Sequence, residues 1–252
     1  SGHHLMQDLD AAGGVSAVIK AGIEGGYVNG SSLTISQKSL SEVVKDAKIM
    51  DTDVIRMENP YSKEGGLMVL RGNFAPLGCV IKSAGVAPEM FEHKGPARVF
   101  DSELEAKAAL DAGEIKKGDV IVVRYEGPKG GPGMQEMLAL TARIGGMGLD
   151  KDVALITDGR FSGGSRGGVI GHISPEAALG GPIALIEEGD LIDINLHKRT
   201  LTLLVDEKTL EERKAKWVCP PPKVKKGWLA QYAQLVGPVS LGAPLITEYE
   251  EI

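Results

Sequence analysis

Two short apolar runs constrain the fold of this chain more than any other feature. Residues 120–123 read VIVV and residues 153–156 read VALI, and neither run alternates with polar side chains. A continuous apolar run of this length is typical of a strand that is covered on both faces. Between the two runs, MLALTARIGG carries a helical pattern. The segment therefore predicts a strand, a helix and a second strand, which indicates an α/β fold.

Patterns on either side of these runs extend the alternation. SELEAKAALDAG predicts a helix in which Ser102 and Glu105 form a capping box and Gly113 supplies the C-terminal stop. Residues 191–196 and 200–205 alternate strictly between apolar and polar side chains, which predicts an antiparallel hairpin. Because some strands are parallel and at least one pair is antiparallel, we expect a mixed α/β class, with a barrel-like sheet and helices outside it.

Five further segments carry helical signals. GVSAVIKAGI has apolar residues at helical spacing, and SEVVKDAKI begins at Ser41, a possible cap. In SPEAALGG, Ser174 stands at the expected cap and Pro175 at the first helical position. TLEERKAKW and WLAQYAQLV predict two helices near the C-terminal end, on either side of a proline-rich link.

Composition and charge exclude several classes of protein. The 252 residues are 42% hydrophobic and 25% charged, as in ordinary globular proteins, and the net charge of −6 without a basic stripe argues against a nucleic-acid partner. No apolar run approaches the ~18 residues of a membrane span, and no signal peptide is visible. We expect a soluble, cytoplasmic protein without a membrane partner, while a plastid or mitochondrial location stays open. Residues 1–4, SGHH, look like a tag remnant.

Only two cysteines are present, Cys79 and Cys219, far apart in the sequence. Neither has a second cysteine at the spacing of a metal site, and two cysteines cannot build a disulfide framework. We therefore expect two ordinary reduced thiols.

The segment that follows the second apolar run is unusually rich in glycine. Residues 157–168 read TDGRFSGGSRGG. A glycine-rich turn after a buried strand places backbone N–H groups at the sheet edge, where α/β proteins bind ligands. The hydroxyl of Ser162 can be approached closely there, and Arg160 or Arg166 could pair with a carboxylate or phosphate. The alternative is a structural turn whose serines bond to their own backbone, and the residues alone leave both readings open.

Two other polar residues lie near glycine-rich segments. His172 follows the loop, where it is either a proton carrier or ligand donor, or a structural histidine. Glu136, in GPGMQEM, is expected in the first turn of the next helix, where the helix dipole favours a carboxylate. Its alternative role is that of a ligand for a hard ion such as Mg²⁺.

Taken together, GPGMQEML and TDGRFSGGSRGGVIGHISPEAALGGPIALIEEGDLIDIN resemble the C-terminal domain of the dihydroxy-acid and phosphogluconate dehydratase family. The likeness covers roughly residues 5–236, including MQDLDAAGGV and LRGNFAPLGCVIK. SGGSRG followed by GHISPEAA resembles the dihydroxy-acid branch of the family.

The resemblance implies that water is eliminated from a 2,3-dihydroxy carboxylate to give a 2-keto acid, in valine and isoleucine biosynthesis. Ser162 matches the catalytic base of the family, and Glu136 matches a Mg²⁺ ligand. The expected substrate-binding residues are Arg160, Gly163, Ser165 and His172. A sugar acid or 6-phosphogluconate is the alternative substrate, and a non-catalytic carboxylate-binding module is the rival from another class.

The resemblance also implies cofactors and partners. An iron–sulfur cluster, [2Fe–2S] or [4Fe–4S], and further Mg²⁺ ligands are expected in an N-terminal domain, since Cys79 and Cys219 do not match cluster ligands. Residues 5–60 resemble the helical end of that domain, residues 61–207 a swivelling β/β/α barrel-like domain, and residues 208–252 would form terminal helices and a tail. The expected partners are a small dihydroxy acid, the N-terminal domain and a second copy in a homodimer. The chain alone is expected to be an inactive fragment.

Overall fold

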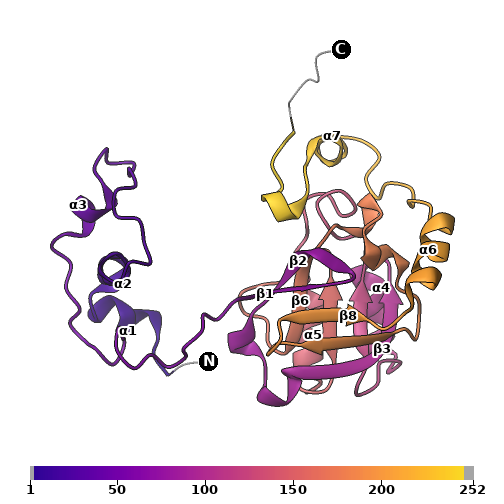
Figure 1. The fold of residues 1–252 in the computed structure, drawn as a ribbon, viewed down its shortest axis with the longest axis horizontal. Helices are drawn as coiled ribbons and strands as arrows, with labels where there is room; N and C mark the ends of the chain where they lie inside the picture. Colours follow the sequence, from indigo (N-terminus) through magenta and orange to yellow (C-terminus); the bar gives the residue numbers. More distant parts are fainter. Residues whose placement is uncertain (1–2, 247–252) are drawn as a thin grey trace, which may run out of the picture. The chain divides into compact units, whose positions relative to one another are not determined.

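The computed structural model describes residues 3–246, so the first two expected tag residues and the last six residues of the tail lie outside it. The chain divides into two compact units, one up to Glu64 and one from Gly65 onward. The described residues form seven α-helices and eight strands (Figure 1). None of the described helices is long and apolar enough to cross a membrane.

The first unit holds three helices and a small apolar core of Ala12, Ala17 and Ile55. They are α1 (Met6–Ala11), α2 (Gly14–Glu24) and α3 (Leu40–Val44). The predicted cap Ser41 is wrong, because the cap of α3 is Ser39. The Ser39 hydroxyl accepts from the Glu42 N–H at 3.3 Å, and the Glu42 carboxylate accepts from the Ser39 N–H at 2.8 Å. This reciprocal box requires the serine three residues before the glutamate, which places the start of the helix.

The second unit is built on a closed barrel of eight strands (Figure 1). Around the barrel the order is β1-β2-β6-β5-β4-β3-β7-β8, and β8 closes on β1. The neighbours β3, β4, β5 and β6 are parallel, whereas β2 and β7 pair antiparallel with both of their neighbours. The strands are β1 (Met68–Gly72), β2 (Ala75–Ile81), β3 (Glu92–Phe100), β4 (Val120–Val123), β5 (Ala154–Thr157), β6 (Gly168–Ser174), β7 (Leu191–Asn195) and β8 (Thr200–Leu203). The predicted mixed α/β barrel is confirmed.

The two apolar runs form buried strands, as predicted, and the structure pairs these strands as parallel neighbours. Every residue of β4 and β5 is buried, and Ile121 pairs with Leu155 across the ladder. The predicted hairpin is also confirmed, since Ile194 of β7 pairs with Leu201 of β8. Both strands turn these alternating apolar side chains inward.

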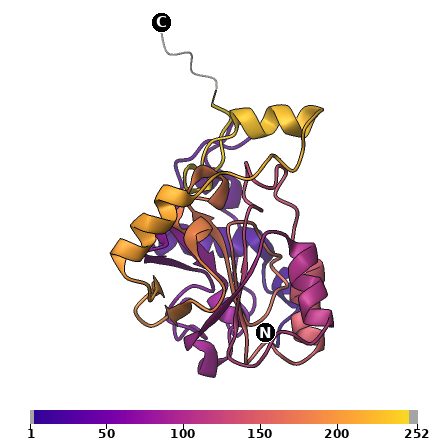
Figure 2. The same cartoon turned by 90° about the vertical axis from the view of Figure 1, so that its right-hand side faces the viewer.

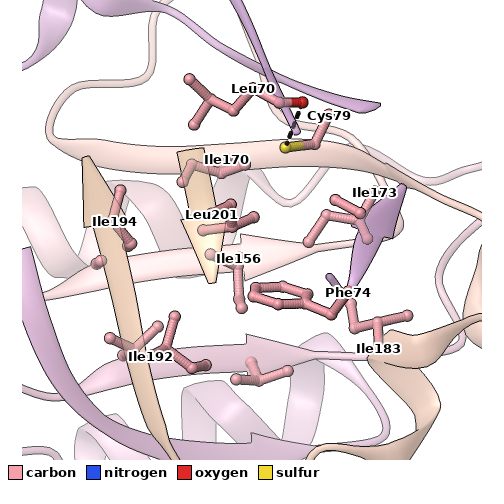
Figure 3. Close-up of a cluster of buried hydrophobic side chains, with 14 of the residues drawn as sticks. Leu70, Phe74, Cys79, Ile156, Ile170, Ile173, Ile183, Ile192, Ile194 and Leu201 are labelled. Atoms are coloured by element: carbon pink, nitrogen blue, oxygen red, sulfur yellow. Dashed lines mark hydrogen bonds between the residues drawn. The ribbon is translucent and has the colours of Figure 1, made fainter. Parts of the chain in front are cut away.

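The barrel interior is filled by apolar side chains from several strands (Figure 3). Phe74, Ile156 and Ile170 are fully buried there. Cys79 also points into this core and donates to the Leu70 carbonyl at 3.5 Å. Burial raises the pKa of the Cys79 thiol to about 12, so the thiol stays protonated. Both cysteines are free, as expected.

Two helices cover the outer face of the parallel strands. Figure 2 shows α4 (Glu103–Asp111) and α5 (Leu138–Gly146) together on one side of the barrel, α6 (Glu207–Lys216) on the other side, and α7 (Trp228–Leu235) above the barrel. The Ser102 hydroxyl caps α4 by accepting from the Glu105 N–H at 3.2 Å, and Gly113 follows the helix with φ +72°. The Glu105 carboxylate accepts from the Asp101 N–H instead of completing the predicted box.

The predicted helix in SPEAALGG is wrong in position and length. Ser174 is the last residue of β6, where it pairs with Gly78 of β2, and the Ser174–Pro175 peptide is cis. Only a single 3₁₀ turn forms, at Ala177–Leu179, with Glu176 at its cap. Because the strand ladder engages Ser174, the serine is not available as a helix cap.

Candidate active site

The site is built from two loops that leave the carboxyl ends of adjacent parallel strands. We call residues 124–137, after β4, the β4 loop and residues 158–167, after β5, the β5 loop. The two loops run against each other: the Met137 N–H donates to the Arg160 carbonyl at 3.2 Å, and the Arg160 guanidinium donates to the Met134 carbonyl at 2.5 Å. A parallel bridge pairs Glu136 with Arg160. Loops at this edge of an α/β sheet are where ligands bind.

Glu136 does not lie in the first turn of α5, so that prediction is wrong. The helix begins at Leu138, because the backbone of Glu136 is engaged in the bridge to Arg160. The Glu136 side chain is half-buried, and within residues 3–246 no hydrogen bond or ion pair engages its carboxylate. The helix-cap role is therefore excluded, and the carboxylate is free to bind a ligand.

Ser162 lies at a sharp turn in the β5 loop. Its hydroxyl accepts from the Gly164 N–H at 3.0 Å, and its carbonyl accepts from the Ser165 N–H at 3.1 Å. Ser162 therefore accepts hydrogen bonds from the backbone of its own loop, as expected for a structural turn. The same N–H would stabilise an oxyanion at Ser162, because a backbone donor directed at a developing negative charge lowers its energy. Both roles fit one geometry.

The remaining loop residues differ in access. Gly163, Gly164 and Arg166 are exposed, whereas the Ser165 side chain is 7% exposed and its hydroxyl has no partner. Ser162 and Arg166 line a hollow of about 330 Å³ beside α5. Ser165 lines the same hollow, but its hydroxyl is buried.

His172 lies on β6 next to the start of the β5 loop, in a left-handed conformation with φ +57°. Its backbone N–H donates to the Gly159 carbonyl at 2.8 Å. Burial, and secondly the charge of Arg160, lowers the pKa of the half-buried imidazole. The ring is therefore neutral at neutral pH, where it can accept a proton or a hydrogen bond.

Asp158, which sequence reasoning did not single out, anchors both loops. It is fully buried directly after β5, and its carboxylate accepts from the N–H groups of Tyr125 at 3.2 Å, Glu126 at 2.9 Å and Ala177 at 2.8 Å. One carboxylate thus ties the ends of β4, β5 and β6 together. The available signal was an acid placed immediately after a buried strand.

Glu176 makes a second anchor of the same kind. The side chain is 2% exposed and accepts from the N–H groups of Lys129 at 3.1 Å and Gly130 at 2.9 Å, both in the β4 loop. Burial raises the pKa of the Glu176 carboxyl, while these hydrogen bonds lower it. Glu176 lies within the helix predicted for SPEAALGG, and a helical position gave no sign of contacts with the β4 loop.

Lys82 is the third residue that sequence reasoning missed. It follows β2, about 80 residues before the β5 loop, and its ammonium donates to the Gly163 carbonyl. No sequence spacing could reveal the contact, because it depends on the pairing of β2 with β6, which lie far apart in the sequence.

The residues present fit one coordination position of a hard metal ion. A half-buried carboxylate without a protein partner, such as that of Glu136, is a suitable oxygen ligand for Mg²⁺. No group of three or more acidic, histidine or cysteine side chains that could hold a metal occurs in the described part of the chain. An iron–sulfur cluster does not fit, since Cys79 is buried inside the barrel and Cys219 is exposed elsewhere.

Two larger hollows also border the β4 loop but do not include the candidate catalytic residues. One of about 640 Å³ is lined by Arg124, Arg213 and Trp217, and another of about 430 Å³ by Lys129, Cys219 and Ala233. Neither is lined by Ser162, Arg160 or Glu136. We place the site by its chemistry rather than by the size of the hollow.

The comparisons with known proteins agree on one family. The model of the dihydroxy-acid/6-phosphogluconate dehydratase C-terminal family matches residues 53–243. The dihydroxy-acid dehydratase of Desulfatibacillum aliphaticivorans is 55% identical over 246 residues, which are 97% of this chain and 44% of that protein. Those of Carboxydothermus hydrogenoformans and Lachnospira eligens are each 55% identical, over 96% and 100% of this chain and 44% and 45% of their own lengths. The chain spans somewhat less than half the length of these relatives.

Proposed function

This chain belongs to the dihydroxy-acid/6-phosphogluconate dehydratase C-terminal family, and we propose that it is the part of a dihydroxy-acid dehydratase that carries the catalytic base. The whole protein would convert 2,3-dihydroxy-3-methyl carboxylates to 2-keto acids in valine and isoleucine biosynthesis. Residues 61–207 would form the swivelling domain, residues 5–60 the helical end of the preceding domain, and residues 208–252 the terminal helices and tail. The further partners would be that preceding domain and a second copy of the protein.

Ser162 is the proposed base, and the geometry of its turn carries the proposal. The serine alkoxide would remove the C2 proton, and the C2–H electron pair would form the C2=C3 double bond. The C3–O bond breaks, and the departing hydroxide would take up the proton that Ser162 removed from C2, so that water leaves and the alkoxide is restored. The enol then tautomerises to the 2-keto acid. Serine is a weak acid, so its alkoxide requires donors; the Gly164 N–H at 3.0 Å from Oγ is one of them.

The substrate would lie between Ser162 and the bridge that joins the two loops. The exposed Arg160 guanidinium suits the substrate carboxylate, and neutral His172 can accept from a substrate hydroxyl. The exposed backbone of Gly163 lets a ligand approach closely. Ser165 would take part only after a shift of the loop, because its hydroxyl is buried.

Glu136 would supply one oxygen ligand to Mg²⁺. When bound, the ion would neutralise the substrate carboxylate and the enolate charge that develops during proton removal. Its other ligands, and those of an iron–sulfur cluster, would come from the preceding domain, since the described residues do not provide them.

The test is turnover by the longer protein that contains this chain, purified without oxygen. We expect 2-keto acid formation from 2,3-dihydroxyisovalerate, and a loss of at least 10²-fold in kcat for Ser162→Ala, the usual contribution of a general base. Ser240→Ala, which truncates an exposed serine elsewhere on the second unit, is the matched control and should match wild type. Full activity of Ser162→Ala would contradict the proposal.

A phosphorylated sugar acid is the second candidate substrate. Arg166 is exposed beside Ser162 and has no hydrogen-bond or ion-pair partner among residues 3–246, so it could pair with a phosphate. The same assay with 6-phosphogluconate decides between them. A higher kcat/KM for 6-phosphogluconate would keep the mechanism and change the substrate.

A further inference from the structure

The part of the β5 loop that carries Ser162 has few restraints of its own. Residues 161–166 contain two hydrogen bonds within the loop, both made to Ser162. Glycine at positions 163 and 164 adds backbone freedom, which makes a single loop conformation costly in entropy. A base that must meet a C2 proton needs a fixed position. Something outside the loop must therefore supply the restraint.

That restraint comes from the turn after β2. Within the described residues, the bond from the Lys82 ammonium to the Gly163 carbonyl is the one hydrogen bond that reaches residues 161–166 from outside the loop. A second bond fixes the end of the loop, where the Gly167 N–H donates to the Gly85 carbonyl at 2.9 Å. Residues 82–85 thus hold the loop at two points.

The close approach of this turn depends on the absence of a side chain at Gly85. A Cβ at that position would lie 3.1 Å from the Ser165 carbonyl oxygen and 3.7 Å from the Arg166 Cα. The neighbouring strand pairing fixes the turn in place, since Ile81 at the end of β2 pairs with Ile170 of β6. Lys82 therefore projects from a rigid support.

The geometry of one peptide unit connects Lys82 with Ser162. The Gly163 carbonyl and the Gly164 N–H belong to the same planar trans peptide, so they point in opposite directions. Lys82 binds the carbonyl end of this unit, and the N–H end donates to the Ser162 hydroxyl at 3.0 Å. A cation on the carbonyl both fixes the plane and polarises the N–H, because linked hydrogen bonds strengthen one another.

We propose that Lys82 is a positioning residue for the base, which orients the peptide between Gly163 and Gly164 so that its N–H stabilises the Ser162 alkoxide. The inference rests on the proposed role of Ser162 as base. Lys82 acts through this peptide and does not itself react. Its positive charge also lies one residue from the serine, where it favours the ionised form of the hydroxyl.

The first experiment follows the loop without any turnover. Lys82→Met keeps the aliphatic stem and removes the ammonium. Lys117→Met is the matched control, since Lys117 is 74% exposed and pairs with Asp152 at the opposite ends of the strands. In amide hydrogen exchange on this chain, we expect Gly164 to exchange at least 10-fold faster in Lys82→Met and at the wild-type rate in Lys117→Met. Unchanged exchange at Gly164 would overturn the inference.

The second experiment measures catalysis in the longer protein. Removal of one alkoxide donor predicts a fall of about 10²-fold in kcat for Lys82→Met, with KM within a few-fold of wild type. The alkaline rise of kcat with pH should move to higher pH, and Lys82→Arg should restore most of the rate. A Lys82→Met enzyme with the kcat and pH profile of Lys117→Met would overturn the inference. If wild type is inactive, the proposed function fails, and the exchange experiment still decides whether Lys82 orients the peptide.

Discussion

At the scale of single residues, the buried carboxyl of Asp158 makes the free energy of unfolding depend on pH. The pKa of this carboxyl is raised to about 6. Burial is the largest cause of the raised pKa, the neighbouring Glu176 carboxylate adds to it, and the N–H groups of Ala177, Glu126 and Tyr125 partly offset it. The folded protein therefore binds this proton more tightly than the unfolded chain, in which an aspartate has a pKa near 3.8. The stabilising contribution of the proton is complete below about pH 4 and is lost as the pH rises through about 6.

We expect this pH dependence of the stability to be absent in Asp158→Asn, which has no proton to titrate at this position. Between about pH 4 and pH 7, the free energy of unfolding of wild type should fall relative to the variant by up to about 3 kcal/mol, at about 1.4 kcal/mol per pKa unit. Urea unfolding of both proteins across this range measures the difference. Glu176 is present in both, so its titration cancels to first order. Parallel pH curves for the two proteins would show that Asp158 keeps an ordinary pKa.

At the same scale, the sequence indicated the candidate site residues but not the residues that hold their loops in place. Ser162 and Glu136 stand in glycine-rich segments beside strand and helix patterns, so local chemistry pointed to them. Asp158, Glu176 and Lys82 act through backbone groups far away in the sequence. Their partners are set by strand register and barrel closure, which a single sequence does not contain.

At the level of elements, apolar patterns correctly predicted the strands whose formation depends on burial. Helix-cap signals were wrong where another contact engages the same residues. The strands β4 and β5 and the β7–β8 hairpin follow directly from their residue patterns. The expected caps Ser41 and Ser174 were wrong. The capping box of α3 is formed by Ser39 and not by Ser41, and Ser174 pairs with β2 as the last residue of β6. Local propensity is a weak prior when a tertiary contact opposes it.

The hydrogen bonds from the β4 loop to the Glu176 carboxylate give a prediction at the scale of elements. A Cβ added at Gly127 would lie 2.6 Å from the Glu176 Oε2 atom, so Gly127→Ala must push the carboxylate off its N–H donors at Lys129 and Gly130. We expect a loss of about 1–3 kcal/mol in the free energy of unfolding, the cost of leaving a buried polar group poorly satisfied.

Gly145→Ala is the matched control for this change. Gly145 lies inside α5, and a Cβ there would meet no atom within 4 Å, so alanine should stabilise the helix by up to about 1 kcal/mol. Chemical denaturation of both variants measures the contrast. Equal effects of the two substitutions would mean that the space around Gly127 is not occupied by the Glu176 carboxylate.

On the scale of the whole molecule, the described residues contain the proposed base, Ser162, and one candidate metal ligand, Glu136. They include no group of three potential metal ligands, and the chain spans less than half of its matched relatives. One monodentate carboxylate holds a strongly hydrated ion such as Mg²⁺ only weakly. A site divided between two halves of a protein forms only when both halves are present.

The last prediction follows from this division. The 252-residue chain alone should show no saturable Mg²⁺ binding below millimolar concentrations by calorimetry and no turnover of 2,3-dihydroxyisovalerate, whereas the longer protein should show both. Glu136→Gln should likewise show no saturable binding below millimolar concentrations in the isolated chain. In the longer protein the same change should weaken Mg²⁺ binding at least 10-fold, because only there does the carboxylate complete a coordination shell. Tight Mg²⁺ binding by the isolated chain that Glu136→Gln abolishes would instead place the whole metal site within these residues.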